Sequence, residues 1–138
     1  MRRAALVALL VGMLALTVSL VWWTNRPAWG AAELATLQTL ARVLGETTRA
    51  VDFVARYGGE EFVILLPHTP DAVHAMAVAE KIRAAIADTA FPGPGRLTVS
   101  IGASLWQPAD PDAGSLIARA DAALYQAKAA GRNRVVLG

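Results

Sequence analysis

The sequence predicts an α+β domain preceded by one hydrophobic segment, and three features of its 138 residues indicate this. No charged residue occurs from Ala4 to Trp23. After that segment, stretches with the helical repeat of apolar residues alternate with stretches that have the two-residue repeat of strands. Hydrophobic residues make up 55% of the chain and charged residues only 17%, which excludes an intrinsically disordered protein.

The hydrophobic segment 4–23 has the length of a membrane-spanning helix. Twenty residues of helix extend about 30 Å, which matches the core of a bilayer. Two arginines precede the segment, a pair of tryptophans ends it at the expected interface, and Arg26 follows. A cleaved signal peptide is the alternative, because small residues follow between positions 28 and 31. The apolar run is longer than the hydrophobic core of most signal peptides, which favours an uncleaved anchor. We therefore expect residues 1–26 to form a single-pass anchor in the inner, cytoplasmic membrane.

A helix and a hairpin of strands are expected next. Apolar residues recur at helical spacing from Glu33 to Thr48, which predicts a helix. Residues 51–57 alternate in polarity, and residues 62–66 are all apolar, as in a strand buried on both faces. Gly58 and Gly59 lie between these strands, and two glycines favour the positive φ angles of a tight hairpin.

The order then continues with helix, strand, helix and strand. Asp71 is an expected N-cap for a helix that ends near Asp88, followed by a Pro- and Gly-rich loop at 91–95. Residues 97–105 alternate strictly between apolar and small or polar residues, the clearest strand pattern of the chain. A last helix from Leu116 to near Gly131 and a short strand at 135–137 complete the order.

This order corresponds to the βαββαβ plan of ferredoxin-like domains with the first strand absent. In that plan the first strand is central and pairs beside the strand at 62–66. Without it, two strand edges inside the sheet have no partner, which native sheets normally avoid. From the element order we nevertheless expect an antiparallel-type sheet with packed helices that lacks its central first strand.

Two adjacent carboxylates, Glu60 and Glu61, follow the glycines at the expected hairpin. Like charges repel each other and a turn does not need acids, so one interpretation is a metal-binding or proton-transfer site. The neighbouring glycines would let a large ligand approach the backbone closely. The other interpretation is a solvated hairpin tip, and the two acids by themselves do not decide between them.

The residues around this hairpin resemble a known family. Residues 55–62 read ARYGGEEF and closely resemble the signature hairpin of GGDEF-domain diguanylate cyclases, in its GGEEF variant. Three further blocks agree in order and spacing: TVSIG at 98–102, ADAALYQAK at 120–128 and GRNRV at 131–135. The resemblance extends from about Glu33 to Val136, so residues 31–138 are interpreted as a partial GGDEF domain.

The resemblance implies a nucleotidyl-cyclase palm fold and a defined reaction. Two GTP molecules, one on each subunit of a dimer, are condensed to cyclic di-GMP and pyrophosphate, with Mg²⁺ or Mn²⁺ as the cofactor. Glu60 and Glu61 are implied as the catalytic and metal-binding acids. The residues implied to bind the substrate are Gly58, Gly59, Lys128 and Arg132. Without the resemblance, Lys128 and Arg132 would be interpreted as cations that favour the C-terminus of a helix.

Arg49 and Asp52 match the family's RxxD product-inhibition site, at the expected offset before Gly58. Arg49 would bind a phosphate or a guanine edge, and Asp52 would accept a hydrogen bond from guanine. A surface ion pair is the alternative interpretation. Glu80, Lys81 and Arg83 are expected on a solvated face of their helix.

Members of the family begin with a strand that carries a metal-binding Asp, followed by a Phe-Lys-x-x-Asn-Asp-like stretch and a helix. Residues 24–32 contain no Asp and no Phe-Lys pair. We therefore expect a domain that lacks its first strand and helix, with an incomplete active site and impaired cyclase activity. The alternatives are a non-catalytic cyclic di-GMP receptor and a non-functional fragment.

The expected partners are GTP, cyclic di-GMP, and either a second copy of the chain or a complete GGDEF protein. A nucleic acid polymer is not expected, because the net charge is only +2 and no basic stripe accompanies it. GTP is cytoplasmic, so a functional domain would lie in the cytoplasm. Arg2 and Arg3 outnumber Arg26 and favour the opposite orientation.

Overall fold

The computed structural model describes residues 14–20, 30–58, 61–93 and 95–138. Its main sheet has five strands in the order β2-β3-β1-β6-β7. Strands β6 and β7 are parallel, and the other neighbouring strands are antiparallel. The strands of the sheet are β1 (Leu14–Leu20), β2 (Phe53–Gly58), β3 (Glu61–Leu66), β6 (Val99–Leu105) and β7 (Val135–Leu137).

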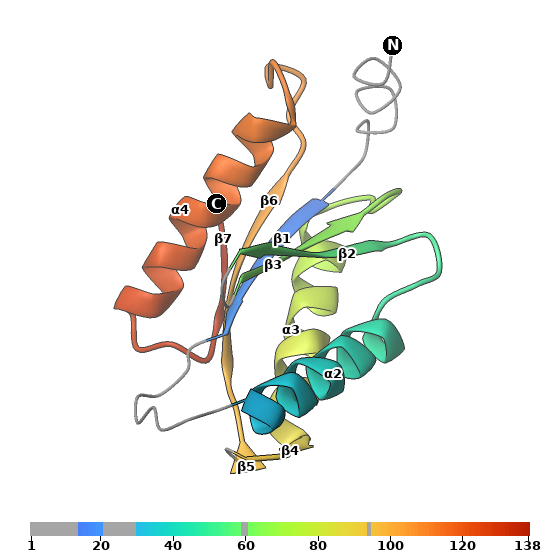
Figure 1. Cartoon of the computed structure of the whole chain (residues 1–138). Coiled ribbons are helices and arrows are strands. Elements are labelled where there is room, and N and C mark those ends of the chain that lie inside the picture. The colour runs from blue at the N-terminus through green and yellow to red at the C-terminus, as the bar shows by residue number, and fades with distance from the viewer. Residues whose placement is uncertain (1–13, 21–29, 59–60, 94) are drawn as a thin grey trace.

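The sheet lies between helices on both of its faces. Helices α2 (Gly30–Thr47) and α3 (Ala72–Asp88) cover one face, and α4 (Ala113–Ala129) covers the other (Figure 1). Asp71 caps α3 as expected, since its Oδ1 accepts a hydrogen bond of 2.9 Å from the backbone N–H of His74. That hydrogen bond lowers the pKa of Asp71. The predicted α+β class is therefore confirmed.

Strand β1 overturns the prediction of a membrane helix for residues 14–20. These residues form the central strand of the sheet, where Val18 is opposite Phe62 of β3 and Ile101 of β6. The prediction that the first strand is absent was therefore also wrong. Hydropathy cannot distinguish the two cases, because a strand buried on both faces is as uniformly apolar as a membrane helix. The strand is favoured because the facing edges of β3 and β6 would otherwise lack hydrogen-bonding partners, and β1 pairs with both.

The rest of the hydrophobic segment, residues 4–13 and 21–23, lies outside the described residues. Among the helices that the structure does describe, none combines the length and the hydrophobicity needed to cross a membrane.

The main core lies between the sheet and helices α2 and α3. Strand β3 contributes Phe62, Ile64 and Leu66 to it, and all three are buried. The other side chains of this core are Leu40, Val43, Leu44, Ala75, Ala79, Ile82, Ile86, Phe91, Leu97, Val99, Ile101 and Ala103. A smaller cluster on the opposite face joins Leu116 and Ala120 of α4 to Leu65 and Trp106.

Gly102 lets α4 pack directly on β6. A Cβ atom at this position would lie 2.0 Å from the carbonyl oxygen of Ala120 and 2.3 Å from the backbone nitrogen of Leu124. Two positions further along the strand, the Ser104 hydroxyl donates a hydrogen bond of 2.7 Å to the carbonyl oxygen of Leu116. The backbones of helix and strand are therefore in contact along this line.

The segment expected as a loop at 91–95 belongs in part to a short hairpin. Strands β4 (Ala90–Phe91) and β5 (Gly95–Arg96) pair with each other outside the main sheet. Phe91 is buried in the main core, and the Thr36 hydroxyl of α2 donates a hydrogen bond of 2.8 Å to the Pro92 carbonyl oxygen. This hairpin therefore closes the main core beside α2.

Candidate functional site

The hairpin acids lie at one end of the sheet. Gly58 of β2 pairs with Glu61 of β3, Glu61 is opposite Ser19 of β1, and Ser19 is opposite Ser100 of β6. We call these four residues the site row. The pairing of β2 with β3 shifts register between Arg56 and Gly58, an irregularity of the kind often found beside active sites. Gly59 and Glu60 lie outside the described residues.

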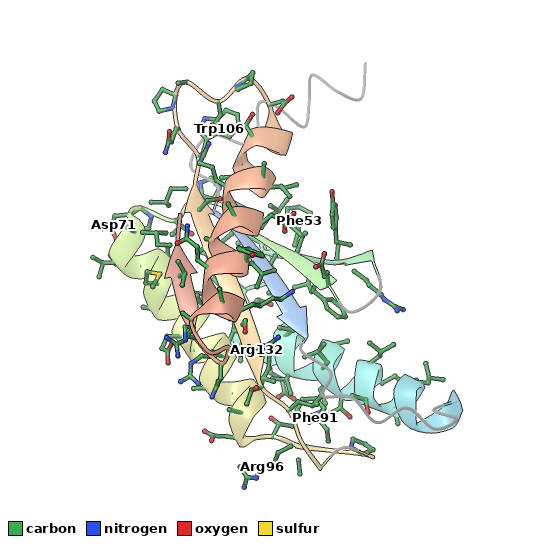
Figure 2. All side chains as sticks on the ribbon, turned by 90° about the vertical axis from the view of Figure 1, so that its left-hand side faces the viewer. Phe53, Asp71, Phe91, Arg96, Trp106 and Arg132 are labelled. Carbon is green, nitrogen blue, oxygen red and sulfur yellow. The ribbon has the colours of Figure 1, made fainter. Side chains whose placement is uncertain are left out.

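The predicted phosphate-binding cations lie at the same end of the sheet. Helix α4 runs antiparallel to β6, since Ser104 contacts Leu116 and Gly102 lies against Ala120 and Leu124. The helix therefore extends from the Leu105 end of the strand toward the end that carries Ser100. Lys128 is in the last turn of α4 and is partly buried, whereas Arg132 follows the helix and is exposed. Figure 2 shows Arg132 at the opposite end of α4 from Trp106. The structure therefore brings Lys128, Arg132 and the site row to one end of the fold.

The turn that carries Arg132 has an unusual backbone. Gly131, Arg132 and Asn133 have φ angles of 114°, 64° and 46°. Two hydrogen bonds close the helix end: Arg132 N–H donates to Ala127 O at 3.0 Å, and Gly131 N–H donates to Lys128 O at 3.3 Å. A side chain in the left-handed region costs about 1 kcal/mol, so two in succession require support from neighbouring groups.

That support includes a contact from α3 that the sequence did not reveal. Arg83 Nη1 donates to Asn133 Oδ1 at 2.8 Å, and Arg83 Nε donates to Glu80 Oε1 at 2.7 Å. The Arg83 side chain is only 21% exposed, so the prediction of a solvated face was wrong for this residue. The hydrogen bond between Glu80 and Arg83 lowers the pKa of Glu80 and raises that of Arg83.

The sequence predicts only one of the two contacts that Arg83 makes here. The three-residue spacing of Glu80 and Arg83 predicts their ion pair. Asn133 is 50 residues from Arg83, and no periodic pattern connects the two. Only the packing of α3 beside the turn after α4 brings them together.

The residues present do not fit a site for two metal ions. Strand β1 places Ser19 opposite Glu61, and the sequence of Leu14–Leu20 contains no carboxylate. Within the described residues there is no group of three or more His, Cys, Asp or Glu side chains that could hold a metal ion. Glu60 and Glu61 could share one Mg²⁺ with the phosphates of a nucleotide, because Mg²⁺ commonly uses one or two carboxylates together with substrate phosphates.

Arg49 and Asp52 form a separate feature at the opposite end of the hairpin, before β2 begins and beside Pro67. Arg49 Nη2 lies 2.9 Å from Asp52 Oδ1, and the backbone N–H of Arg49 donates to Asp52 Oδ2 at 2.6 Å. Arg49 Nη2 also donates to the Pro67 carbonyl oxygen at 2.7 Å. The Asp52 side chain is 2% exposed, whereas that of Arg49 is 54% exposed. Asp52 therefore holds Arg49 in place, and Arg49 faces solvent.

Comparison with known proteins identifies the family. Residues 32–134 match the family model described as "Diguanylate cyclase, GGDEF domain". The chain belongs to the GGDEF family. This confirms the predicted resemblance, and the match starts close to the residue expected for a domain without its opening segment.

Curated relatives of this GGDEF protein are considerably longer than the chain. Diguanylate cyclase A of Treponema denticola is 43% identical over 104 residues, which cover 73% of this chain and 28% of that protein. Diguanylate cyclase DgcM of Escherichia coli K12 is 46% identical over 100 residues, which cover 72% of this chain and 24% of that protein. The aligned region thus spans about a quarter of each relative.

Solved GGDEF domains share the fold. The active GGEEF domain of a diguanylate cyclase from Vibrio cholerae superposes with a TM-score of 0.74 at 27% identity, covering 98% of this chain and 90% of that one. The GGDEF domain of DgcB from Caulobacter crescentus, in complex with c-di-GMP, gives 0.70 at 28% identity, covering 91% and 77%. The first superposition reaches well before residue 32, where the family match begins.

Proposed function

We propose that this GGDEF domain is of the diguanylate cyclase type and condenses two GTP to cyclic di-GMP and pyrophosphate at a strongly reduced rate. The observation that carries the proposal is the site row. It retains Glu61 of the signature hairpin, but β1 places Ser19 and no carboxylate opposite it. Relatives and structural neighbours described as diguanylate cyclases support the type of reaction.

Some residues of the chain would bind the nucleotide, and others would stabilise the charge that develops during the reaction. Lys128 and Arg132 would hold the triphosphate, and Gly58 and Gly59 would let the nucleotide lie against the hairpin. When the 3′-hydroxyl of one GTP attacks the α-phosphate of the other, negative charge grows on phosphoryl oxygens, and nearby cations stabilise it. Glu60 and Glu61 are the acids of this site and would hold the Mg²⁺ or Mn²⁺ ion, which would supply further positive charge to the phosphates.

The reaction needs two bound GTP molecules, so the active form would contain two GGDEF domains. The partner would be a second copy of this chain or a complete GGDEF protein. Because GTP is cytoplasmic, the domain would act in the cytoplasm. Attachment to the inner membrane finds no support in residues 14–20, which belong to the sheet.

Turnover of GTP tests this proposal. The full chain, incubated with GTP and Mg²⁺ beside the Vibrio cholerae GGEEF domain, is expected to form cyclic di-GMP about 100-fold more slowly, a typical cost of removing one charge-stabilising group. Product would be measured by chromatography. The product that does form should disappear in Glu61→Gln and persist in Glu46→Gln, which changes an exposed acid of α2. A rate equal to that of the reference domain would contradict the proposed impairment.

Binding of cyclic di-GMP without turnover is the second candidate function. The geometry of Arg49 favours it, because a buried carboxylate holds an exposed guanidinium ready to meet a phosphate or a guanine edge. The Caulobacter crescentus DgcB domain, solved with c-di-GMP, is a structural neighbour. Asp52, whose carboxylate is turned toward Arg49, would position that side chain in the receptor.

Calorimetric titration of cyclic di-GMP onto the full chain tests the receptor function. Arg49→Ala is expected to weaken binding about tenfold or more, because it removes a charged hydrogen-bonding group. Arg42→Ala is the matched control, since Arg42 is 56% exposed and also paired with an acid, Glu46. Equal affinities for the wild type and Arg49→Ala would exclude Arg49 from the site.

A further inference from the structure

We propose that Arg83 and Asn133 form a tether that positions Arg132 for triphosphate binding. The inference rests on the proposed function, because it assigns Arg132 to the phosphates of the substrate. It adds two positioning residues outside the signature hairpin. One of them comes from α3, an element that carries none of the residues predicted for the nucleotide site.

The tether joins elements that are distant in sequence. Arg83 Nη1 of α3 donates to Asn133 Oδ1 at 2.8 Å across 50 residues. Glu80, one helical turn earlier, accepts from Arg83 Nε at 2.7 Å and fixes the orientation of the guanidinium. The Arg83 side chain is 21% exposed, so this planar group is held against the protein surface. A fixed guanidinium is a rigid anchor for the residue that it contacts.

The backbone of the turn explains why an anchor is needed. Arg132 and Asn133 both lie in the left-handed region, at φ angles of 64° and 46°. Asn tolerates this region better than most residues, whereas Arg does not gain from it. Backbone strain of this kind persists where surrounding contacts over-determine it, and it occurs frequently at ligand-binding sites. The hydrogen bond on Asn133 is such a contact, next to the strained Arg132.

Contacts on both sides of Arg132 complete the restraint. Its N–H donates to Ala127 O at 3.0 Å, and its carbonyl oxygen accepts from Arg134 Nε at 3.1 Å. The Arg134 carbonyl oxygen accepts from the backbone N–H of Ile101 at 2.9 Å, which connects the turn to β6. The backbone of Arg132 is therefore fixed while its side chain is exposed. A preordered cation loses less conformational entropy when it binds an anion.

Asn133→Gly provides the clearest test. Glycine adopts the left-handed backbone without strain and removes no charge, but it deletes the Oδ1 acceptor. With inorganic triphosphate as the probe, calorimetry on the full chain is expected to show about threefold to tenfold weaker binding, the cost of ordering a free side chain on binding. Arg83→Met should also weaken binding, and adding Asn133→Gly to it should cause little further loss, since both remove the same hydrogen bond. Arg42→Met, which removes a paired arginine of α2, should bind as the wild type does.

Two reference measurements separate the possible failures. Arg132→Ala should weaken triphosphate binding by at least tenfold; if it does not, both the phosphate site of the proposed function and the tether are wrong. If Arg132→Ala weakens binding but Asn133→Gly and Arg83→Met do not, the tether alone is wrong. Thermal unfolding of each variant completes the set. Lower melting temperatures with unchanged affinity, measured well below melting, would also overturn the tether, because they indicate a purely structural contact.

Discussion

Thr17→Pro is expected to abolish cooperative folding of the chain. Thr17 is at the centre of β1, opposite Val63 of β3 on one side and Gly102 of β6 on the other. Proline has no N–H to donate to either neighbour, and it is tolerated in sheets almost only on edge strands. The lost ladder hydrogen bond leaves a buried carbonyl unpaired, at a cost of about 1–3 kcal/mol, and the proline ring adds a steric clash in the middle of the sheet. Together these are a large part of the stability of a small domain. Circular dichroism during thermal unfolding measures it.

Thr17→Val is the matched control for this substitution. Valine keeps the backbone N–H and the branching at Cβ that favours strands, so the melting curve should remain cooperative. The pair also tests the assignment of residues 14–20 in solution. If Thr17→Pro unfolds like the wild type, residues 14–20 do not form the central strand of the sheet.

Gly102→Ala is expected to destabilise the domain by about 3 kcal/mol, the upper part of the range for overpacking a core. The added Cβ would lie 2.0 Å from Ala120 O and 2.3 Å from Leu124 N, and both are backbone atoms that no rotamer change can move away. Helix α4 would have to shift off β6, and Lys128 would shift with it. Urea unfolding gives the stability, and triphosphate titration of the folded fraction should show weaker binding.

Gly45→Ala is the corresponding control. Gly45 is inside α2, and a Cβ atom there would meet nothing within 4 Å. Alanine is the better helix former, so this variant should be more stable by about 0.5–1 kcal/mol. Equal effects of the two substitutions would show that close packing at Gly102 does not control stability.

Local patterns were sufficient to predict most elements of the domain. The strict alternation at 97–105 predicted β6, and Asp71 predicted the start of α3, where it caps the helix. Each of these patterns involves residues that are close together in the chain, so the sequence alone is enough to recognise it. The short hairpin β4–β5 was missed because each of its strands is too short to show a period.

The candidate site residues could be named from the sequence where they belong to a recognisable motif. The ARYGGEEF stretch and three further blocks pointed to one family, and the family match at 32–134 confirms it. The roles of Lys128 and Arg132 follow from that resemblance and stay a prediction. The structure adds that these cations and Glu61 lie at one end of the sheet, and that Arg49 and Asp52 lie at the other. It also adds the contact between Arg83 and Asn133, which no motif contains.

The sequence by itself determined the family and the helices, because each depends on residues close together in the chain. Only the tertiary structure decided the role of residues 14–20. Their apolar pattern is equally suitable for a bilayer and for the middle of a sheet, since both surround the backbone with apolar groups. The element order predicted two open strand edges, but only the folded domain shows that residues 14–20 pair with both of them, β3 on one side and β6 on the other.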